Sequence, residues 1–233
     1  MTKIFRTAIA ATMLAGAATA ATMPVQAAAQ VAGFATANPE LAIAQSTARA
    51  TAYQQIGQQY QAQITQIGQL SEQLATLEQQ IDTNRDGQVT QAEAQANSAA
   101  LQQAQTLSQQ LDTLSRPIQL AQMYALEQIA RDYGNARTAA MQSRGVQVLL
   151  DPTAVQSAPE GFDITDAIVA QINTRLPAVT TAPPADWRPS QTVLQLHQTV
   201  GQIIGIAVRR QMMIDAQQQQ GQQPAATPAP TGR

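Results

Sequence analysis

The sequence predicts a mainly α protein, built as a long antiparallel coiled-coil hairpin on a small base of β-strands. Two long segments carry apolar residues at steps of three and four, which is the spacing of a coiled-coil seam. Aromatic residues are only 3% of the chain and charged residues 12%, while glutamine is abundant. This composition favours an elongated helical rod over a thick globular core.

The first arm of the hairpin is predicted from about residue 39 to residue 81. Its apolar positions follow the helical spacing at Tyr53, Ile56, Tyr60, Ile64, Ile67, Leu70, Leu74, Leu77 and Ile81. A strict heptad would place Gln63 in the seam where the sequence offers Ile64. One continuous helix is therefore expected, with a local deviation at this point.

The second arm is predicted from about residue 91 to residue 143, so that the hairpin as a whole covers about 39–143. Its seam consists of Leu107, Leu111, Leu114, Ile118, Tyr124, Ile129 and Tyr133. Pro117 lies inside this segment, and a proline removes one backbone hydrogen bond from a helix. We therefore expect a kink near residues 113–116.

Short strands are expected on both sides of the hairpin. Residues 30–35 (QVAGFA) and 146–150 (VQVLL) have strand-like composition, and they would lie together at the base. Further along, Asp163 is positioned to cap a helix over 165–176.

The segment beyond Pro177 is expected to be an addition to this domain. Residues 178–190 are rich in proline and predict a linker with few contacts crossing it. An extra helix is expected over 191–216, followed by a disordered tail over 217–233.

The first 29 residues have the pattern of a signal peptide. Lys3 and Arg6 precede a run of small apolar residues and several small-x-small cleavage sites, which predicts export to the periplasm. Removal of residues 1–29 leaves 11 basic residues (13 less 2) against 15 acidic ones, a formal charge of −4. Such a chain is a poor candidate for binding nucleic acid. No later stretch is apolar enough to form a transmembrane anchor.

Residues 82–93 (DTNRDGQVTQAE), between the two arms, match the pattern of an EF-hand calcium loop. Oxygen ligands occur at positions one, three, five, seven, nine and twelve of the loop, which are Asp82, Asn84, Asp86, Gln88 through its backbone carbonyl, Thr90 and Glu93. Gly87 stands at position six, where the loop turns sharply. The pattern indicates a Ca²⁺ site at the tip of the hairpin.

An alternative interpretation of the same segment stays open. No second loop is present to pair with the first, and Asp86-Gly87 is also an ordinary sequence for a polar turn that reverses a helical hairpin.

The residues give little support for catalysis, and we expect no enzymatic activity. His197 is the only histidine, so a Ser-His-Asp triad would depend on it and a multi-histidine metal site within one chain is excluded. It is expected on the polar side of the last helix. Cysteine is absent, which excludes disulfides and thiol chemistry.

The order of these segments resembles the Skp/OmpH family of periplasmic chaperones. The local similarity is strongest over 146–173, where VQVLLDPTAVQSAPEGFDITDAIVAQIN corresponds to the returning strand, the turn and the helix that begins with DIT. The hairpin matches the family in length and periodicity. Together these features assign residues 30–177 to an OmpH/Skp-like domain.

The resemblance implies a homotrimer in which strands from three subunits form a small barrel and three hairpins surround a cavity. Such proteins hold unfolded outer-membrane proteins and prevent their aggregation, without ATP. This chain departs from the family in its glutamine-rich arms with almost no lysine, in its tip loop and in the added segment 178–233. Client capture through a positively charged cavity is therefore not expected of this chain.

Glutamine side chains on the arms offer an alternative means of contact, since each carries both donors and acceptors for a client backbone. They are Gln61, Gln63, Gln102, Gln103, Gln109 and Gln110. Each one is also an ordinary helix-compatible surface residue.

Three function classes remain at this point: a client-holding chaperone, a calcium-binding structural rod of the cell envelope, and an adaptor of an efflux or secretion system. The adaptor is disfavoured because such proteins need large β domains on both flanks of the hairpin.

Overall fold

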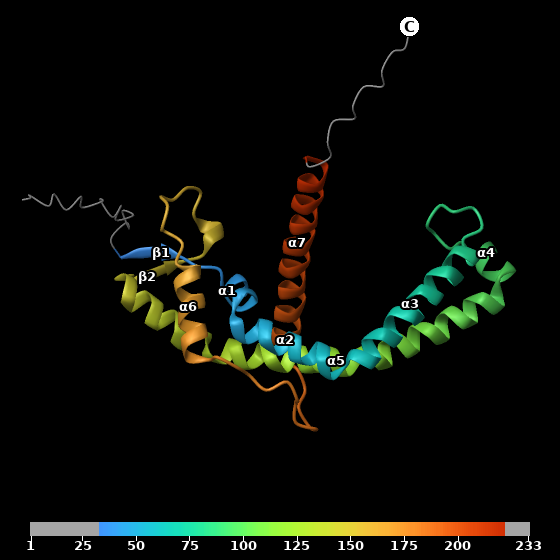
Figure 1. Cartoon of the computed structure of the whole chain (residues 1–233), viewed down its shortest axis with the longest axis horizontal. Helices are drawn as coiled ribbons and strands as arrows, with labels where there is room; N and C mark the ends of the chain where they lie inside the picture. Colours follow the sequence, from blue (N-terminus) through green and yellow to red (C-terminus); the bar gives the residue numbers. More distant parts are fainter. Residues whose placement is uncertain (1–32, 222–233) are drawn as a thin grey trace, which may run out of the picture.

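The computed structural model describes residues 33–221, and this range forms a long, bent helical molecule with a small strand pair at one end (Figure 1). The signal peptide predicted over 1–29 and the tail from 222 onward lie outside the described residues. The elements in chain order are β1 (Phe34–Thr36), α1 (Pro39–Gln45), α2 (Thr47–Gln59), α3 (Gln61–Ile81), α4 (Gln91–Ala96), α5 (Ser98–Arg144), β2 (Val148–Leu150), the 3₁₀ turn Pro152–Ala154, α6 (Thr165–Arg175) and α7 (Gln191–Gly221).

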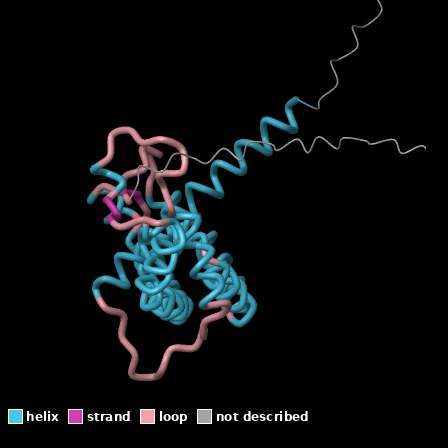
Figure 2. Tube along the Cα trace, turned by 90° about the vertical axis from the view of Figure 1, so that its left-hand side faces the viewer, coloured by secondary structure: helices cyan, strands magenta, loops and turns pink. Residues whose placement is uncertain are grey.

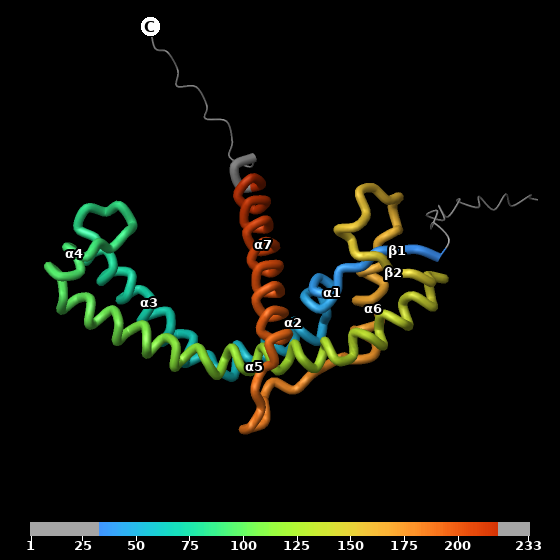
Figure 3. The backbone as a smooth tube through the Cα atoms, turned by 180° about the vertical axis from the view of Figure 1, so that it is seen from behind, coloured from blue at the N-terminus to red at the C-terminus, as the bar shows by residue number. Residues whose placement is uncertain are grey.

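The helical hairpin is confirmed, with α3 and α5 side by side and the loop between α3 and α4 at its tip (Figures 1 and 3). Helix α5 runs the whole length of the molecule, from the tip to the strands. Its helix continues through Pro117 while bending along its course. The strands, α7 and the tip loop all rise from the same side of this bent helix in Figure 1.

The two strands lie together at the base, as expected, and they pair in parallel. Phe34 is in register with Val148, and Ala35 with Leu149. The described strand begins at Phe34, within the predicted range 30–35, and ends one residue beyond it, while residues 30–32 lie outside the described residues. A backbone bridge extends the pair at Thr36, whose N–H donates to the carbonyl of Phe162 at 3.0 Å.

Asp163 does not cap α6 in the way the sequence predicted. The N-cap position belongs to Ile164, and Asp163 lies one residue earlier, where its Oδ1 accepts from the backbone N–H of Thr165 at 2.7 Å. The bridge of Asp163 to Thr36 explains the shift, because the chain is still extended at this residue. The carboxylate therefore fixes the turn between the strand bridge and the helix.

The first arm is divided into three helices instead of the single helix that was predicted. Ser46 ends α1 and begins α2, because its hydroxyl donates to the carbonyl of Ile43 at 2.8 Å and accepts from the N–H of Arg49 at 3.3 Å. Tyr60 separates α2 from α3. The short α1 can thereby turn toward the base while α3 follows the arm.

The seam of the arm keeps a strict heptad register where the sequence deviates from it. Gln63 is half-buried in the seam, whereas Ile64 is 43% exposed. Geometry explains this result, since the next seam positions, Ile67 and Leu70, continue the register from residue 63 and not from residue 64. The deviation at Ile64 therefore leaves an isoleucine on the surface.

The main core lies at the base, where α1, α6 and α7 pack against the second half of α5. Its largest fully buried side chains include Leu126, Ile129, Ile168, Ile172 and Val200. Alanines on α1 and α5, including Ala42, Ala136 and Ala140, are also fully buried. Small side chains let helix axes approach closely, so this core is dense although aromatic residues are few.

Residues 178–190 do not behave as a free linker. Gln128 on α5 exchanges hydrogen bonds with the backbone of Thr180, and the Trp187 Nε1–H donates to Glu127 Oε2 at 2.7 Å. The Trp187 ring also packs edge-on against Tyr124, with ring centroids 5.2 Å apart. The expectation of few contacts is wrong here, because a proline-rich segment that cannot form a helix can still dock through its backbone and its side chains.

The first half of helix α7 packs against the core, and its second half extends into solvent. Val193 and Val200 are buried against the body, whereas Met212 and Met213 are more than 60% exposed. The helix continues to Gly221, five residues beyond the predicted end at 216, so residues 217–221 are not disordered. Figure 2 shows its outer half extending away from the rest of the described chain.

His197 lies on the docked part of α7, which corrects the expectation of a polar position. The side chain is half-buried, and its Nδ1 is buried without a hydrogen-bond partner. Burial lowers the pKa of His197, because the charged imidazolium would lose hydration there.

The first prediction concerns the docked segment after α6. A chain that ends at Pro177 should lose about 3 to 6 kcal/mol in free energy of unfolding. Helix α7 buries its residues Val193 and Val200 against the body, and each buried valine contributes roughly 1.5 to 3 kcal/mol. Denaturant unfolding followed by circular dichroism measures the difference. A chain that ends at Gly221 is the control and should match the full-length protein. Equal stability of the two shortened chains would contradict the docking of α7.

Candidate functional site

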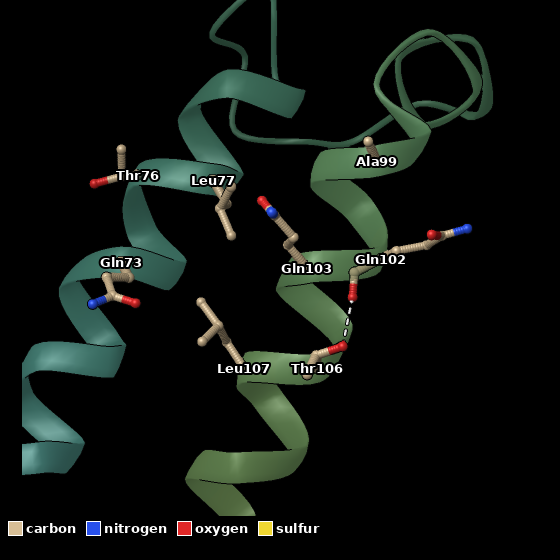
Figure 4. A pocket seen from close by; sticks show the side chains of 8 residues that line it. All are labelled: Gln73, Thr76, Leu77, Ala99, Gln102, Gln103, Thr106 and Leu107. Carbon is tan, nitrogen blue, oxygen red and sulfur yellow. Dashed lines mark hydrogen bonds between the residues drawn. The ribbon is translucent and has the colours of Figure 1, made fainter.

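Two features outside the core are candidates for function, namely grooves along the arms and the loop at the tip. The grooves arise because α3 and α5 meet only along a narrow apolar seam. Figure 4 shows Leu77 and Leu107 pointing from the two helices into the space between them, with Gln103 beside them. The side chains flanking the seam stay accessible to solvent.

One groove has a volume of about 790 Å³ and lies near the tip. It is lined by Gln73, Thr76, Leu77, Ala99, Gln102, Gln103, Thr106 and Leu107. A second groove, of about 400 Å³, shares Thr106 and is lined also by Gln66, Gln109, Gln110, Thr113 and Leu114. Neither groove has a charged side chain in its lining.

The hydrogen bonds of the lining residues determine what the grooves offer to a ligand. Thr76, Thr106 and Thr113 each donate their hydroxyl proton to the carbonyl four residues earlier, at 2.8 to 3.0 Å. The glutamine amides that line the grooves have no intramolecular partner among the described residues. Free donors and acceptors therefore belong to glutamine, while the threonines contribute methyl groups and lone pairs.

The tip loop has the sharp turn that the sequence predicted. Gly87 has φ +80°, and Arg85 also has a positive φ, +60°. Asp82 holds this turn, since its Oδ2 accepts from the N–H of Gly87 at 2.8 Å and its Oδ1 from the N–H of Asp86 at 3.2 Å. The residues expected at loop positions one, five and six are thus brought together.

The other ligand candidates in the first half of the loop also bind backbone amides. Asn84 Oδ1 accepts from the N–H of Asp86 at 2.9 Å, and Asp86 Oδ1 accepts from the N–H of Gln88 at 2.8 Å. The Asn84 amide donates to the second oxygen of Asp86 at 3.0 Å. The side chain of Gln88 is exposed.

Glu93 is the most constrained residue of the loop, with only 8% of its surface exposed. Its Oε1 accepts from the N–H and hydroxyl of Thr83 and from the N–H of Asn84, at 3.0 to 3.2 Å. Its Oε2 accepts from the N–H and hydroxyl of Thr90, at 3.0 and 2.7 Å. Thr90 and Glu93 together form a capping box at the start of α4.

These hydrogen bonds lower the pKa of Glu93 to about 2. The Thr90 hydroxyl is the largest cause, followed by the Thr90 N–H and then the Thr83 hydroxyl. The calcium-loop pattern predicted Glu93 and Thr90 as metal ligands, and Thr83 was not among the predicted residues. The signal for the capping box was nevertheless present, as a threonine followed three residues later by a glutamate.

The described residues contain no group of three or more Asp, Glu, His or Cys side chains arranged to hold a metal ion. Asp82, Asp86 and Glu93 each face backbone amides of the loop. The oxygen donors suit Ca²⁺ in kind, and Glu93 would have to exchange its threonine partners for the ion. Within the same range, no helix is both long and apolar enough to cross a bilayer.

The fold thus defines a helical-hairpin protein with a strand pair at its base. Comparison with known protein families matches residues 33–172 to the family described as outer membrane protein (OmpH-like). This match covers more than half of the chain, so the protein belongs to the OmpH-like family, and the resemblance found in its sequence is confirmed. Residues 173–221, including α7, lie outside the matched stretch.

One solved structure is similar to the chain, an OmpH-like protein from Caulobacter crescentus CB15 described as a candidate outer membrane chaperone. It is 20% identical in sequence with a TM-score of 0.42, and the similarity covers 68% of this chain and 94% of that one. No curated protein matches the chain.

The second prediction concerns the pH dependence of the tip. Because the pKa of Glu93 is lowered from 4.5 to about 2, its carboxylate stabilises the loop fully above pH 4.5, and this contribution is lost as the pH falls toward 2. The amide resonances of Thr83, Asn84 and Thr90 should therefore titrate with a midpoint near pH 2. In Glu93→Gln the same amides should show no such transition. A midpoint near 4.5 in the unmodified protein would contradict the hydrogen-bonded geometry.

Proposed function

We propose that this protein is a periplasmic holdase chaperone that binds unfolded outer-membrane proteins and prevents their aggregation. Its membership of the OmpH-like family and the uncharged grooves along its arms support the proposal. The principal observation is that the grooves combine leucine side chains with glutamine amides that have no partner of their own.

Such a surface suits the task of holding an unfolded β-barrel chain. The client exposes apolar side chains together with unpaired backbone groups that would otherwise pair with other chains. A surface with scattered apolar positions and neutral polar groups makes many weak contacts, so it can shield the client without fixing its fold. Holding a client through such contacts does not require ATP.

The third prediction is that the mature protein suppresses aggregation of an outer-membrane β-barrel diluted from urea, in the absence of ATP and calcium. Light scattering measures the effect, which should grow with chaperone concentration and saturate. A soluble protein of similar mass and charge serves as the control. Unchanged aggregation at excess chaperone would refute the holdase function.

We propose further that the chaperone is a homotrimer joined through the strands at its base. The resemblance to the Skp/OmpH family implies this assembly, and the exposed face of the strand pair supports it. Phe34 and Val148 are register partners that are 43% and 41% exposed, whereas Ala35, the next residue of the first strand, is buried in the core of the subunit. An exposed apolar strand pair needs a covering surface.

The fourth prediction follows from this interface. Val148→Asp should leave the helical content unchanged and convert the assembly into monomers, because each subunit would place a charge at an apolar contact. Light scattering combined with size-exclusion chromatography measures the mass. Val89→Asp is a matched control, since Val89 is 47% exposed but lies in the tip loop. A Val148→Asp protein that keeps its mass would show that the interface lies elsewhere.

A second candidate function is a calcium-binding structural rod of the cell envelope, in which the tip loop is the working part. It is favoured by the oxygen-rich loop sequence and by the turn at Gly87. Because Ca²⁺ must compete with the hydrogen bonds of Glu93, and because no paired loop is present, we expect weak binding. A Kd on the order of 10⁻⁴ to 10⁻³ M is typical of extracellular sites.

The fifth prediction tests this loop. Isothermal titration with calcium should give heat at millimolar ion for the unmodified protein, and Glu93→Gln should abolish it because one bidentate ligand is lost. Magnesium is the control ion. If both proteins respond alike, the segment is an ordinary turn stabilised by its own hydrogen bonds.

A further inference from the structure

The two uncharged grooves form one continuous strip along one side of the hairpin. They share Thr106, and Gln103 and Gln110 lie seven residues apart on α5, which places them on the same face two turns apart. From Ala99 to Leu114 the lining of α5 extends over roughly 22 Å at about 1.5 Å per residue. An extended polypeptide of about six or seven residues has this length at about 3.3 Å per residue.

The strip differs from a neighbouring groove of the hairpin, with which it shares Gln109. That groove has a volume of about 410 Å³ and includes Glu78 and Val89 in its lining. The uncharged strip instead presents half-buried leucines in the middle and glutamine amides along both margins. A chain lying along it would meet apolar contacts below and both donors and acceptors at its sides.

We infer that this strip binds an extended segment of unfolded polypeptide, with glutamine amides pairing to the client backbone and no requirement for charge. The inference rests on the proposed holdase function and specifies its binding site and ligand class. Backbone groups are the same in every client, so this mode of binding does not depend on client sequence. It would also account for client capture by a hairpin that contains no lysine.

Because the strip carries no charged side chain, the affinity for the client should depend little on salt concentration. Ion pairs on a protein surface weaken as salt is added, because the screening length falls from about 14 Å at 0.05 M to about 4 Å at 0.5 M. Binding through neutral amides and leucines has no such term. The Kd for an unfolded barrel should therefore change less than about threefold over this range of salt.

The experiment uses the full mature chain and a fluorescently labelled outer-membrane β-barrel diluted from urea. Gln103→Ala/Gln110→Ala removes two amides from the strip, and alanine is the strongest helix former, so the hairpin should persist. The Kd should rise about tenfold, as expected for the loss of two neutral hydrogen bonds. The matched control is Gln105→Ala/Gln119→Ala, because both residues lie on the same helix and neither lines the strip: Gln105 lines the neighbouring groove and Gln119 is exposed. Circular dichroism verifies that both variants remain helical.

The outcomes separate the inference from the function on which it rests. A weakened strip variant, an unchanged control and a Kd insensitive to salt would support the inference. If the unmodified protein binds the barrel but both variants match it, or if salt abolishes binding, the strip is not the site although the holdase function stands. Failure of the unmodified protein to bind the barrel at all would overturn the proposed function and the inference together.

Discussion

Packing against helix α5 is the constraint on which the rest of the structure depends. Six other helices contact α5 within the described chain, and together they form the arm at one end and the core at the other. The two ends differ in the residues that α5 offers. Toward the base, Leu126, Ile129, Ala136 and Ala140 are completely buried, whereas in the arm Ala104 is the main buried position and its neighbours remain accessible. One helix therefore supplies stability at the base and an open surface in the arm.

This division explains why the arm can be so polar. A coiled-coil seam one residue wide buries too little apolar surface to stabilise an isolated hairpin, so the arm depends on its continuity with the core. The residues on either side of the seam then do not have to pack against another helix, and many of them are glutamine. Gln63 shows the consequence most clearly, because it sits in the seam itself while the adjacent Ile64 is left in solvent. Helical register outweighs the hydrophobicity of a single residue at this point.

The sequence was sufficient for features that depend on periodicity or on local chemistry. The apolar steps of three and four predicted the hairpin and most of its seam, and Gly87 predicted the turn at the tip. Features that depend on contacts between segments far apart in the sequence could not be predicted from periodicity or local chemistry. Trp187 is surrounded by prolines, which predicts a linker, yet Glu127 and Tyr124 on α5 hold it against the body. The break at Ser46 was also missed, because serine is tolerated within helices and becomes a cap only when the chain must turn.

The function of the tip loop could also not be predicted fully from the sequence. Side-chain types at residues 82–93 indicated oxygen ligands, but the same oxygens can accept hydrogen bonds from the loop's own amides, and sequence cannot decide between these uses. The structure gives the geometric reason. Thr83 and Thr90 flank Glu93 from opposite ends of the loop and satisfy both of its carboxylate oxygens. These two threonines therefore fix the carboxylate of Glu93 in the loop, and a Ca²⁺ ion bound by Glu93 would have to replace their hydrogen bonds.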